Sequence, residues 1–151
     1  MQDQEPIFQC KFKVNSHVSK KNSRPVHFRK ANIYSRAPFI GKSHKLVLAE
    51  NLMATQLAKS FFASGLKTIK GPIRVQFTFY FSNFYTKKNQ KNKKLPDLSN
   101  LYELPQDAMQ KASVIENDSQ IESHDGSRRK PSHDGHDYIE CKIYNFLENY
   151  E

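Results

Sequence analysis

Two acidic residues, Asp97 and Asp118, lie within a basic part of the chain and are the first candidates for chemistry. They bracket about two turns of an amphipathic pattern. A run of lysines precedes Asp97, and Ser127-Arg128-Arg129-Lys130 follows Asp118. Carboxylates bind divalent metal ions and cations hold phosphates, so this combination is typical of a metal-dependent nuclease.

The charge balance supports a polyanionic partner. The 151-residue chain has 24 Lys+Arg against 15 Asp+Glu, a formal net charge of +9. That balance favours nucleic acid, although charge alone would equally suit a merely soluble basic protein. The cations are concentrated in two connections. They are Lys87, Lys88, Lys91, Lys93 and Lys94 in one, and Lys20, Lys21, Arg24, Arg29 and Lys30 in the other.

Length and cysteine use indicate one cytoplasmic domain. We expect residues 1–151 to form a single domain with frayed ends at 1–6 and 147–151. Cys10 and Cys141 form no disulfide framework, and as buried free thiols they suit a reducing compartment. The sequence after Met1 is polar and is no signal peptide, and no apolar run approaches the ~20 residues of a membrane span.

Alternating apolar and polar residues predict three strands, over residues 7–14, 73–81 and about 138–146. The middle strand follows Gly71-Pro72, and its apolar face is strongly aromatic. We expect that face to pack on helices rather than to stack on bases. Its residues are Ile73, Val75, Phe77, Phe79 and Phe81.

Helical spacing predicts two helices. The first runs from a cap at Ser43 to about Ser64, and Gly65 ends it. The second covers roughly residues 99–112, with a kink at Pro105. The predicted buried sides are Leu46, Ala49, Met53, Leu57 and Phe61 in the first, and Leu101, Leu104, Ala108 and Ala112 in the second.

The remaining segments read as connections. Residues 15–43 and 83–96 are predicted to be basic loops, the former with a short strand at Val26–Phe28. Ser123-His124-Asp125-Gly126 recurs as Ser132-His133-Asp134-Gly135, and the segment between the two copies is predicted to be a basic loop or hairpin tip. The order β, loop, α, β, α, β predicts an α+β domain, with a mixed or antiparallel sheet and two main helices packed on it.

Each candidate site residue also has a structural interpretation. On spacing alone, Asp97 equally suits a helix cap and Asp118 a turn. Asp125 is a further candidate metal ligand, and a turn role before Gly126 competes with it. The histidines have no regular spacing for a transition metal and are interpreted as loop residues that touch phosphate. They are His124, His133 and His136.

Three segments together resemble the RusA family of Holliday-junction resolvases: Pro96-Asp97-Leu98-Ser99-Asn100-Leu101, Asp107-Ala108-Met109 and Glu116-Asn117-Asp118-Ser119-Gln120-Ile121. In that family an Asp-Leu-Asp-Asn-Leu segment opens a helix that carries a later Asp. An Asp-Asp-X-Gln-hydrophobic segment follows. The resemblance extends in order over about residues 7–146, as pattern alone outside the motif.

The resemblance implies a small homodimeric endonuclease of prophage type that depends on Mg²⁺, with Mn²⁺ as a substitute. Such enzymes resolve four-way DNA junctions by paired nicks in recombination and repair. The resemblance assigns the metal-site aspartates to Asp97 and Asp118. It also matches Asn100 and Asp107, although Asp107 equally suits a structural role. The implied partners are branched DNA and a second copy of the chain.

Two positions depart from the family. Its second motif aspartate is Ser99 here, and its catalytic lysine falls on Glu103. Because these residues are four apart in the predicted helix, we hypothesise that Glu103 supplies the missing carboxylate to the metal site. Alternatively, Glu103 is a surface residue that completes a capping box with Asn100.

The missing cation has four candidates, Arg128, Arg129, Lys130 and Lys94. An inactive relative that binds branched DNA, and lost catalysis through Ser99 and Glu103, is the alternative function. An RNA-binding module is ranked last, because the sequence lacks an aromatic RNP-type segment and a Gly-X-X-Gly loop. The predicted DNA-binding residues are Lys87, Lys88, Lys91, Lys93, Lys94, Arg128, Arg129, Lys130, Lys20, Lys21, Arg29 and Lys30.

Overall fold

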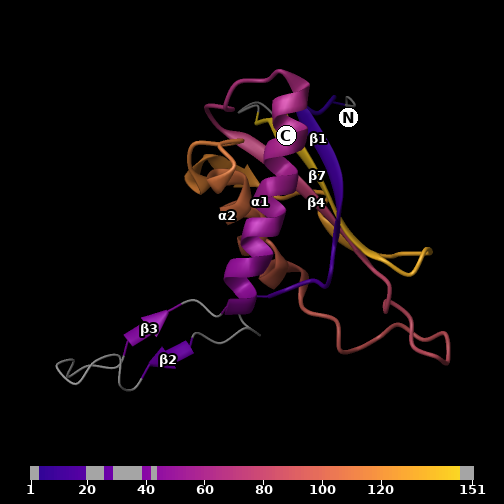
Figure 1. Cartoon of the computed structure of the whole chain (residues 1–151). Helices are drawn as coiled ribbons and strands as arrows, with labels where there is room; N and C mark the ends of the chain where they lie inside the picture. Colours follow the sequence, from indigo (N-terminus) through magenta and orange to yellow (C-terminus); the bar gives the residue numbers. More distant parts are fainter. Residues whose placement is uncertain (1–3, 20–25, 29–38, 42–43, 147–151) are drawn as a thin grey trace.

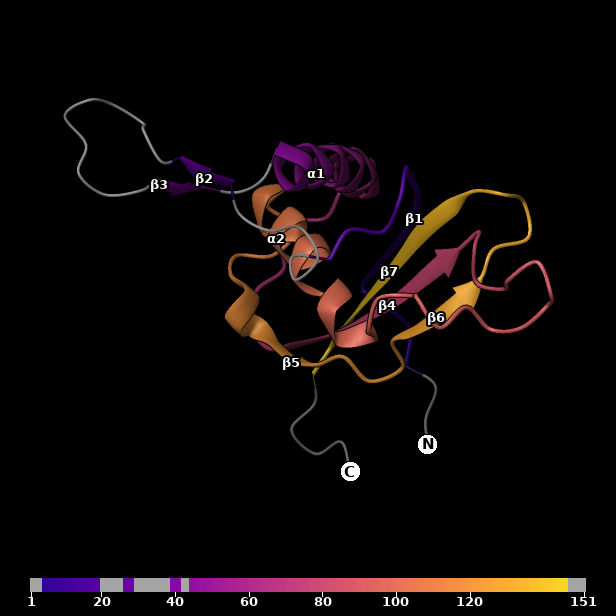
Figure 2. The same ribbon diagram turned by 90° about the horizontal axis from the view of Figure 1, so that it is seen from below.

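A mixed five-stranded sheet lies at the centre of the fold, and the two main helices lie on one of its faces (Figures 1 and 2). The computed structural model describes residues 4–19, 26–28, 39–41 and 44–146. The helices are α1 (His44–Ser64) and α2 (Glu103–Lys111). The architecture is therefore the predicted α+β fold.

The strand order is β1–β7–β4, with β5 and β6 both on the outer edge of β4. β1 and β4 each pair antiparallel with β7, whereas β5 and β6 run parallel to β4. β5 pairs with the beginning of β4 and β6 with its end. The bounds are β1 Phe8–Val14, β4 Ile73–Phe81, β5 Ile121–Ser123, β6 Arg128–Pro131 and β7 Asp137–Asn145.

The three predicted strands correspond to β1, β4 and β7, because alternation fixes which side chains face the helices. Phe77 and Phe79 are 0% and 1% exposed, so the aromatic row of β4 belongs to the core. Across the core, the rings of Phe8 and Phe61 meet edge to face with centroids 5.1 Å apart. The predicted apolar side of α1 is buried except for Ala49, which is half-buried.

The second predicted helix is wrong in its bounds. Leu98–Leu101 form a separate 3-10 helix, η1, and α2 begins only at Glu103. Pro105 explains the break, because it has no N–H and is tolerated only in the first turn of an α-helix. The break changes the buried side as well: Ala112 is half-buried, and Met109 is 0% exposed.

The segment between the two Ser-His-Asp-Gly copies is also corrected. It is not a loop or hairpin tip, because Arg128–Pro131 form β6. Its polar sequence carries no alternation, and its pairing with β4 is set by the tertiary fold. In the first connection β2 (Val26–Phe28) is confirmed, but its partner β3 (Phe39–Gly41) was not predicted.

Several expectations concern residues outside the described parts, among them the Ser43 cap and the fraying at 1–3 and 147–151. Of the remaining N-terminal residues, Gln4 donates a side-chain hydrogen bond to the Asn145 carbonyl at 2.9 Å. Cys10 and Cys141 face each other across β1 and β7 as free thiols. No helix in the described residues is long and apolar enough to cross a membrane.

Candidate metal and DNA site

Asp97 stands at the N-cap position of η1, yet its side chain makes no capping hydrogen bond. The carboxylate is exposed, and no hydrogen bond or ion pair engages it within the described part of the chain. Leu95 and Leu101, on either side, are 8% and 2% exposed and anchor the segment in the core. The structural interpretation of Asp97 as a side-chain cap is therefore wrong, and the carboxylate remains available.

Asp118 opens the second 3-10 helix, η2 (Asp118–Gln120), and it too is exposed. The cap belongs to its neighbour: the Asn117 side chain accepts a hydrogen bond from the Ser119 N–H at 2.9 Å. Asp118 contributes its backbone carbonyl to the end of η2. Within the described residues its carboxylate has no protein partner, like that of Asp97.

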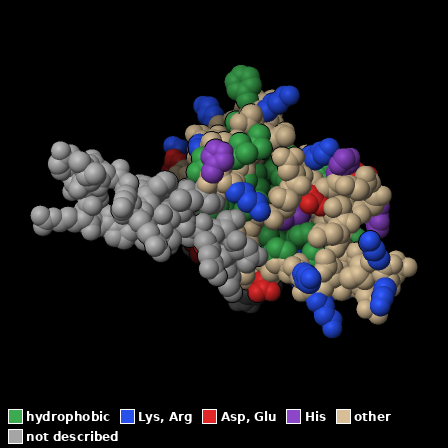
Figure 3. Space-filling model, turned by 60° about the horizontal axis from the view of Figure 1, so that its bottom comes forward, with side chains coloured by type: hydrophobic (Ala, Val, Ile, Leu, Met, Phe, Trp, Pro, Cys, Tyr) green, Lys and Arg blue, Asp and Glu red, His purple; other side chains and the backbone are tan. Residues whose placement is uncertain are grey.

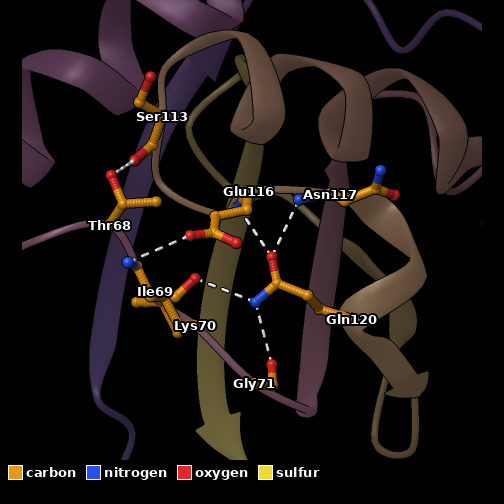
Figure 4. Close-up of polar contacts among 8 residues, drawn as sticks. All are labelled: Thr68, Ile69, Lys70, Gly71, Ser113, Glu116, Asn117 and Gln120. Atoms are coloured by element: carbon orange, nitrogen blue, oxygen red, sulfur yellow. Dashed lines mark hydrogen bonds and ion pairs between the residues drawn. The ribbon is translucent and has the colours of Figure 1, made fainter.

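Gln120 fixes the Asp118 segment to the sheet (Figure 4). Its Oε1 accepts hydrogen bonds from the backbone N–H groups of Glu116 at 2.7 Å and Asn117 at 2.9 Å. Its Nε2 donates to the carbonyls of Ile69 and Gly71, both at 3.0 Å. One amide therefore ties both ends of η2 to the chain that leads into β4.

Glu103 and Ser99 do not lie on one continuous helix, because η1 ends at Leu101 and α2 begins at Glu103. The i,i+4 argument for Glu103 as a replacement ligand therefore loses its geometric basis. The predicted capping box with Asn100 is also absent: Tyr102 is the N-cap of α2 and makes no side-chain cap. Glu103 is exposed in the first turn of α2.

Arg129 connects β6 to the Asp97 segment. Its Nη1 donates a hydrogen bond to the Pro96 carbonyl at 2.9 Å, one residue before Asp97. Because Arg129 pairs with the core residue Phe79, its side chain leaves the sheet on the helix-covered face. Arg128 pairs with Thr78 and Lys130 with Tyr80, so both point to the opposite face.

His124 lies in the connection between β5 and β6, as predicted, but its ring is half-buried and contacts the protein. Its Nδ1 lies 2.9 Å from the Val75 carbonyl, which makes this nitrogen the donor, and Nε2 lies 2.7 Å from the Gln106 amide. The ring stacks on Tyr102 with centroids 4.2 Å apart. Burial lowers the pKa of His124, and the Val75 hydrogen bond opposes that shift. The neutral ring thus joins the β5–β6 connection to α2.

Asp125 lies in a turn, and Asp107 lies at the contact between the two helices. Asp125 occupies a tight turn before Gly126, whose φ is +91°, and its carbonyl accepts a hydrogen bond from Arg74 Nη1 at 3.0 Å. Asp107 is half-buried on α2 and lines a hollow with Glu50 and Lys111. Lys111 Nζ lies 3.8 Å from Glu50 Oε2, so this hollow marks the contact between the helices.

Across the described residues, no group of three or more His, Cys, Asp and Glu side chains could hold a metal ion. Asp97, Asp118, Glu103 and Asp125 thus form no three-ligand cluster. This finding concerns groups of three or more ligands and does not exclude a site made of the two carboxylates of Asp97 and Asp118.

The predicted DNA-binding lysines near Asp97 are all exposed, and Figure 3 shows cationic side chains gathered at the lower right of the face it draws. The exposed residues are Lys87, Lys88, Lys91, Lys93 and Lys94. Lys20, Lys21, Arg29 and Lys30 lie outside the described residues.

Two positioning residues were missed at the sequence level, Gln120 and His124. For Gln120 a signal existed: Asn117 followed three residues later by Gln120 is a capping-box pattern, and the structure contains that box. For His124 no local signal existed, since its partners Val75 and Gln106 are distant in sequence.

The comparison with protein families agrees with these motifs. The family described as Endodeoxyribonuclease RusA matches residues 14–140. No curated protein matches the chain as a relative. The matched range contains β4, both candidate aspartates and Arg129, and it covers most of the 151 residues. The chain therefore belongs to the RusA family of endodeoxyribonucleases.

Proposed function

We propose that the protein is a Mg²⁺-dependent endonuclease that resolves four-way DNA junctions by paired nicks, with Asp97 and Asp118 as the metal ligands. The observation that carries the proposal is the state of these two carboxylates. Both are exposed, Asp97 just before η1 and Asp118 as the first residue of η2, and neither carboxylate is used for capping or ion pairing within the described residues. A negative charge without a partner is unfavourable beside DNA unless a cation binds it.

The carboxylate oxygens of Asp97 and Asp118 are of the ligand type that Mg²⁺ prefers. Mg²⁺ prefers oxygen ligands, binds through one or two carboxylates and keeps several waters, so a two-carboxylate site suits it. Mn²⁺ accepts the same ligands. When bound, the ion would polarise the scissile phosphate and lower the pKa of a bound water. Glu103 and Asp125 are not proposed as additional ligands of this pair, because the described residues contain no group of three or more side chains that could hold a metal ion.

Among the cations proposed to replace the family lysine, Arg129 has the strongest support. Its guanidinium lies beside Pro96 and on the same face of the sheet as the Asp97 segment. One N–H group binds the Pro96 carbonyl, and a guanidinium has five donors. The others are suited to hold a phosphate oxygen next to Asp97.

We further propose a homodimer that acts on DNA in the cytoplasm. A four-way junction has two-fold symmetry, and a C2 dimer offers one site to each of two strands. On α1, three aliphatic side chains are 37–51% exposed and offer an apolar surface for a second copy: Val47, Leu48 and Leu52. Two free thiols support a reducing compartment.

The test is nicking of a synthetic four-way junction by the purified protein, with and without Mg²⁺. We expect symmetric nicks that require Mg²⁺ and that disappear in Asp97→Asn and in Asp118→Asn. Glu140→Gln is the matched control, because Glu140 is a half-exposed carboxylate on the opposite face of the sheet. It should cut like the wild type.

The alternative function gives a different result. An inactive relative would bind the junction with a strong salt dependence and leave it uncut in both Mg²⁺ and Mn²⁺. The departures at Ser99 and Glu103 are the specific observation that favours it. That outcome would contradict the endonuclease and leave a branched-DNA-binding protein.

A further inference from the structure

The connection between β4 and η1, residues 82–95, is a hydrogen-bonded arm that we term the lysine arm. The Thr86 N–H donates to the Gln90 carbonyl at 2.7 Å, and Tyr85 bridges Lys91 across the arm. At its base, Asn92 donates its N–H to the Phe84 carbonyl at 2.8 Å. These contacts give the arm a defined hydrogen-bonded shape.

The turn at the tip of the arm is built by side chains as well as backbone. Thr86 Oγ1 accepts hydrogen bonds from the N–H groups of Lys88 and Gln90, both at 3.3 Å. Asn89 has a φ of +59°, the left-handed conformation that asparagine tolerates in turns. The arm projects from the same side of the molecule as the β6–β7 turn in both ribbon views (Figures 1 and 2).

The arm is a single-sign electrostatic surface. It contains five lysines and no acidic residue, and all five lysines are exposed. At its C-terminal end it runs directly into Pro96 and Asp97. Phosphates held along the arm would therefore be led toward the candidate site.

Tyr85 is the aromatic residue that the arm presents to solvent. Its side chain is 53% exposed, and its ring touches Phe84 edge to face with centroids 5.1 Å apart. Phe84 is half-buried and packs against the core, so it supports the Tyr85 ring from one side. A rigid aromatic ring among exposed lysines is the composition that proteins use to stack on bases while cations hold the phosphates.

We propose that Tyr85 stacks on a base exposed at the branch point of bound DNA and so gives the protein its preference for branched over linear duplex. The inference rests on the proposed function, since it takes branched DNA as the partner. The lysines of the arm are suited to any duplex, because every nucleotide of the backbone carries a phosphate. Stacking on a base needs an unpaired or splayed nucleotide, which a branch point offers and a continuous duplex does not.

The experiment compares affinity for a four-way junction and for a linear duplex of equal length, at one salt concentration and in EDTA so that no DNA is cut. Tyr85→Ala should lower junction affinity about tenfold or more and leave duplex affinity unchanged. Tyr85→Phe should retain the junction preference. Phe62→Ala is the matched control, because Phe62 is an even more exposed aromatic side chain, at 89%, and lies on α1 away from the arm.

In a second experiment, the fluorescent base 2-aminopurine replaces the bases at the branch point. Binding of the wild type should change the fluorescence of this base, and Tyr85→Ala should abolish most of that change at saturating protein. Equal losses on junction and duplex, or an unchanged preference in Tyr85→Ala, would overturn the inference while leaving the proposed function intact. A wild type without junction preference would overturn both.

Discussion

Asp97 and Asp118 lie beside two short 3-10 helices of similar size, yet these helices are held in different ways. The Asp118 helix has a complete capping box, and the Gln120 side chain accepts two hydrogen bonds and donates two. The Asp97 helix has no side-chain cap, and its polar connection to the sheet is the hydrogen bond from Arg129 to the Pro96 carbonyl.

The difference means that the chain segments carrying the two proposed metal ligands are held in place in different ways. Backbone carbonyls and a neutral amide hold Asp118, and DNA does not compete for those contacts. A guanidinium holds the Asp97 segment through one N–H group, and its other donors are suited to bind an incoming phosphate. We therefore expect Asp118 to be fixed in the free protein and Asp97 to take its final position when DNA binds.

Among the variants that test this difference between the two segments, Arg129→Ala should have the largest effect on the nicking rate. Arg129→Ala removes both the tie to Pro96 and a cation next to the reacting phosphate, so single-turnover nicking should fall about 100-fold. Arg129→Lys should recover part of the loss, because it keeps the charge but not the fork geometry.

Arg128→Ala is the control for that prediction, since Arg128 lies on the other face of the sheet. It should affect binding at most. An equal loss of nicking in Arg128→Ala and Arg129→Ala would show that only total charge matters.

Gln120 tests the fixed side of the comparison. Gln120→Ala should destabilise the fold by about 2 kcal/mol, because it leaves the Ile69 and Gly71 carbonyls without their donor. Nicking should fall about tenfold as Asp118 loses its fixed position. Thermal unfolding and nicking rates measure the two effects.

Gln110→Ala, on the exposed side of α2, is the matched control and should change neither quantity. If Gln120→Ala unfolds at the wild-type temperature, the network does not hold Asp118.

The lysine arm should give a smaller and less selective effect. Lys88→Ala should weaken binding to junction and linear duplex alike, and should reduce the salt slope of log K by about one. Lys59→Ala on α1 should leave the slope unchanged. Filter binding across a salt series measures the slope. A loss confined to the junction would contradict the non-specific role of the arm.

The smallest effect should come from His124 and pH. Burial lowers the pKa of His124, so the unfolded state takes up a proton at a higher pH than the folded state does. The His124 contribution to stability is therefore lost as pH falls below the ordinary histidine value. Between pH 7.5 and 5.5, the melting temperature of His124→Asn should fall less than that of the wild type. Equal losses would show that His124 does not titrate differently on folding.

The sequence allowed the long elements to be predicted, but of the short strands it predicted β2 and not β3, β5 or β6. β1, β4, β7 and α1 have alternating or helical patterns long enough to fix their burial. β6 has the sequence Arg-Arg-Lys-Pro, which no pattern distinguishes from a basic loop. It becomes a strand because the exposed edge of β4 offers it hydrogen-bonding groups.

The same limit applies to the site. The motif predicts Asp97 and Asp118 as metal ligands, and the structure removes the competing cap interpretation of Asp97. Which of Arg128, Arg129 and Lys130 lies beside the Asp97 segment depends on the face of the sheet that each side chain takes. The parallel register with β4 decides that face, and a single sequence does not carry it. The break before Glu103 does not follow from the sequence, because a proline in a helical pattern is compatible both with a kink and with the first turn of a new helix.

Asp97 and Asp118 are proposed to act as one metal site. The most direct measurement is the single-turnover nicking rate of a four-way junction in Mg²⁺ for Asp97→Asn, Asp118→Asn and the double variant. Residues that act together are not additive, so each single variant should lose nearly all activity and the double variant should be no slower. Two partial losses that multiply in the double variant would contradict a shared metal site.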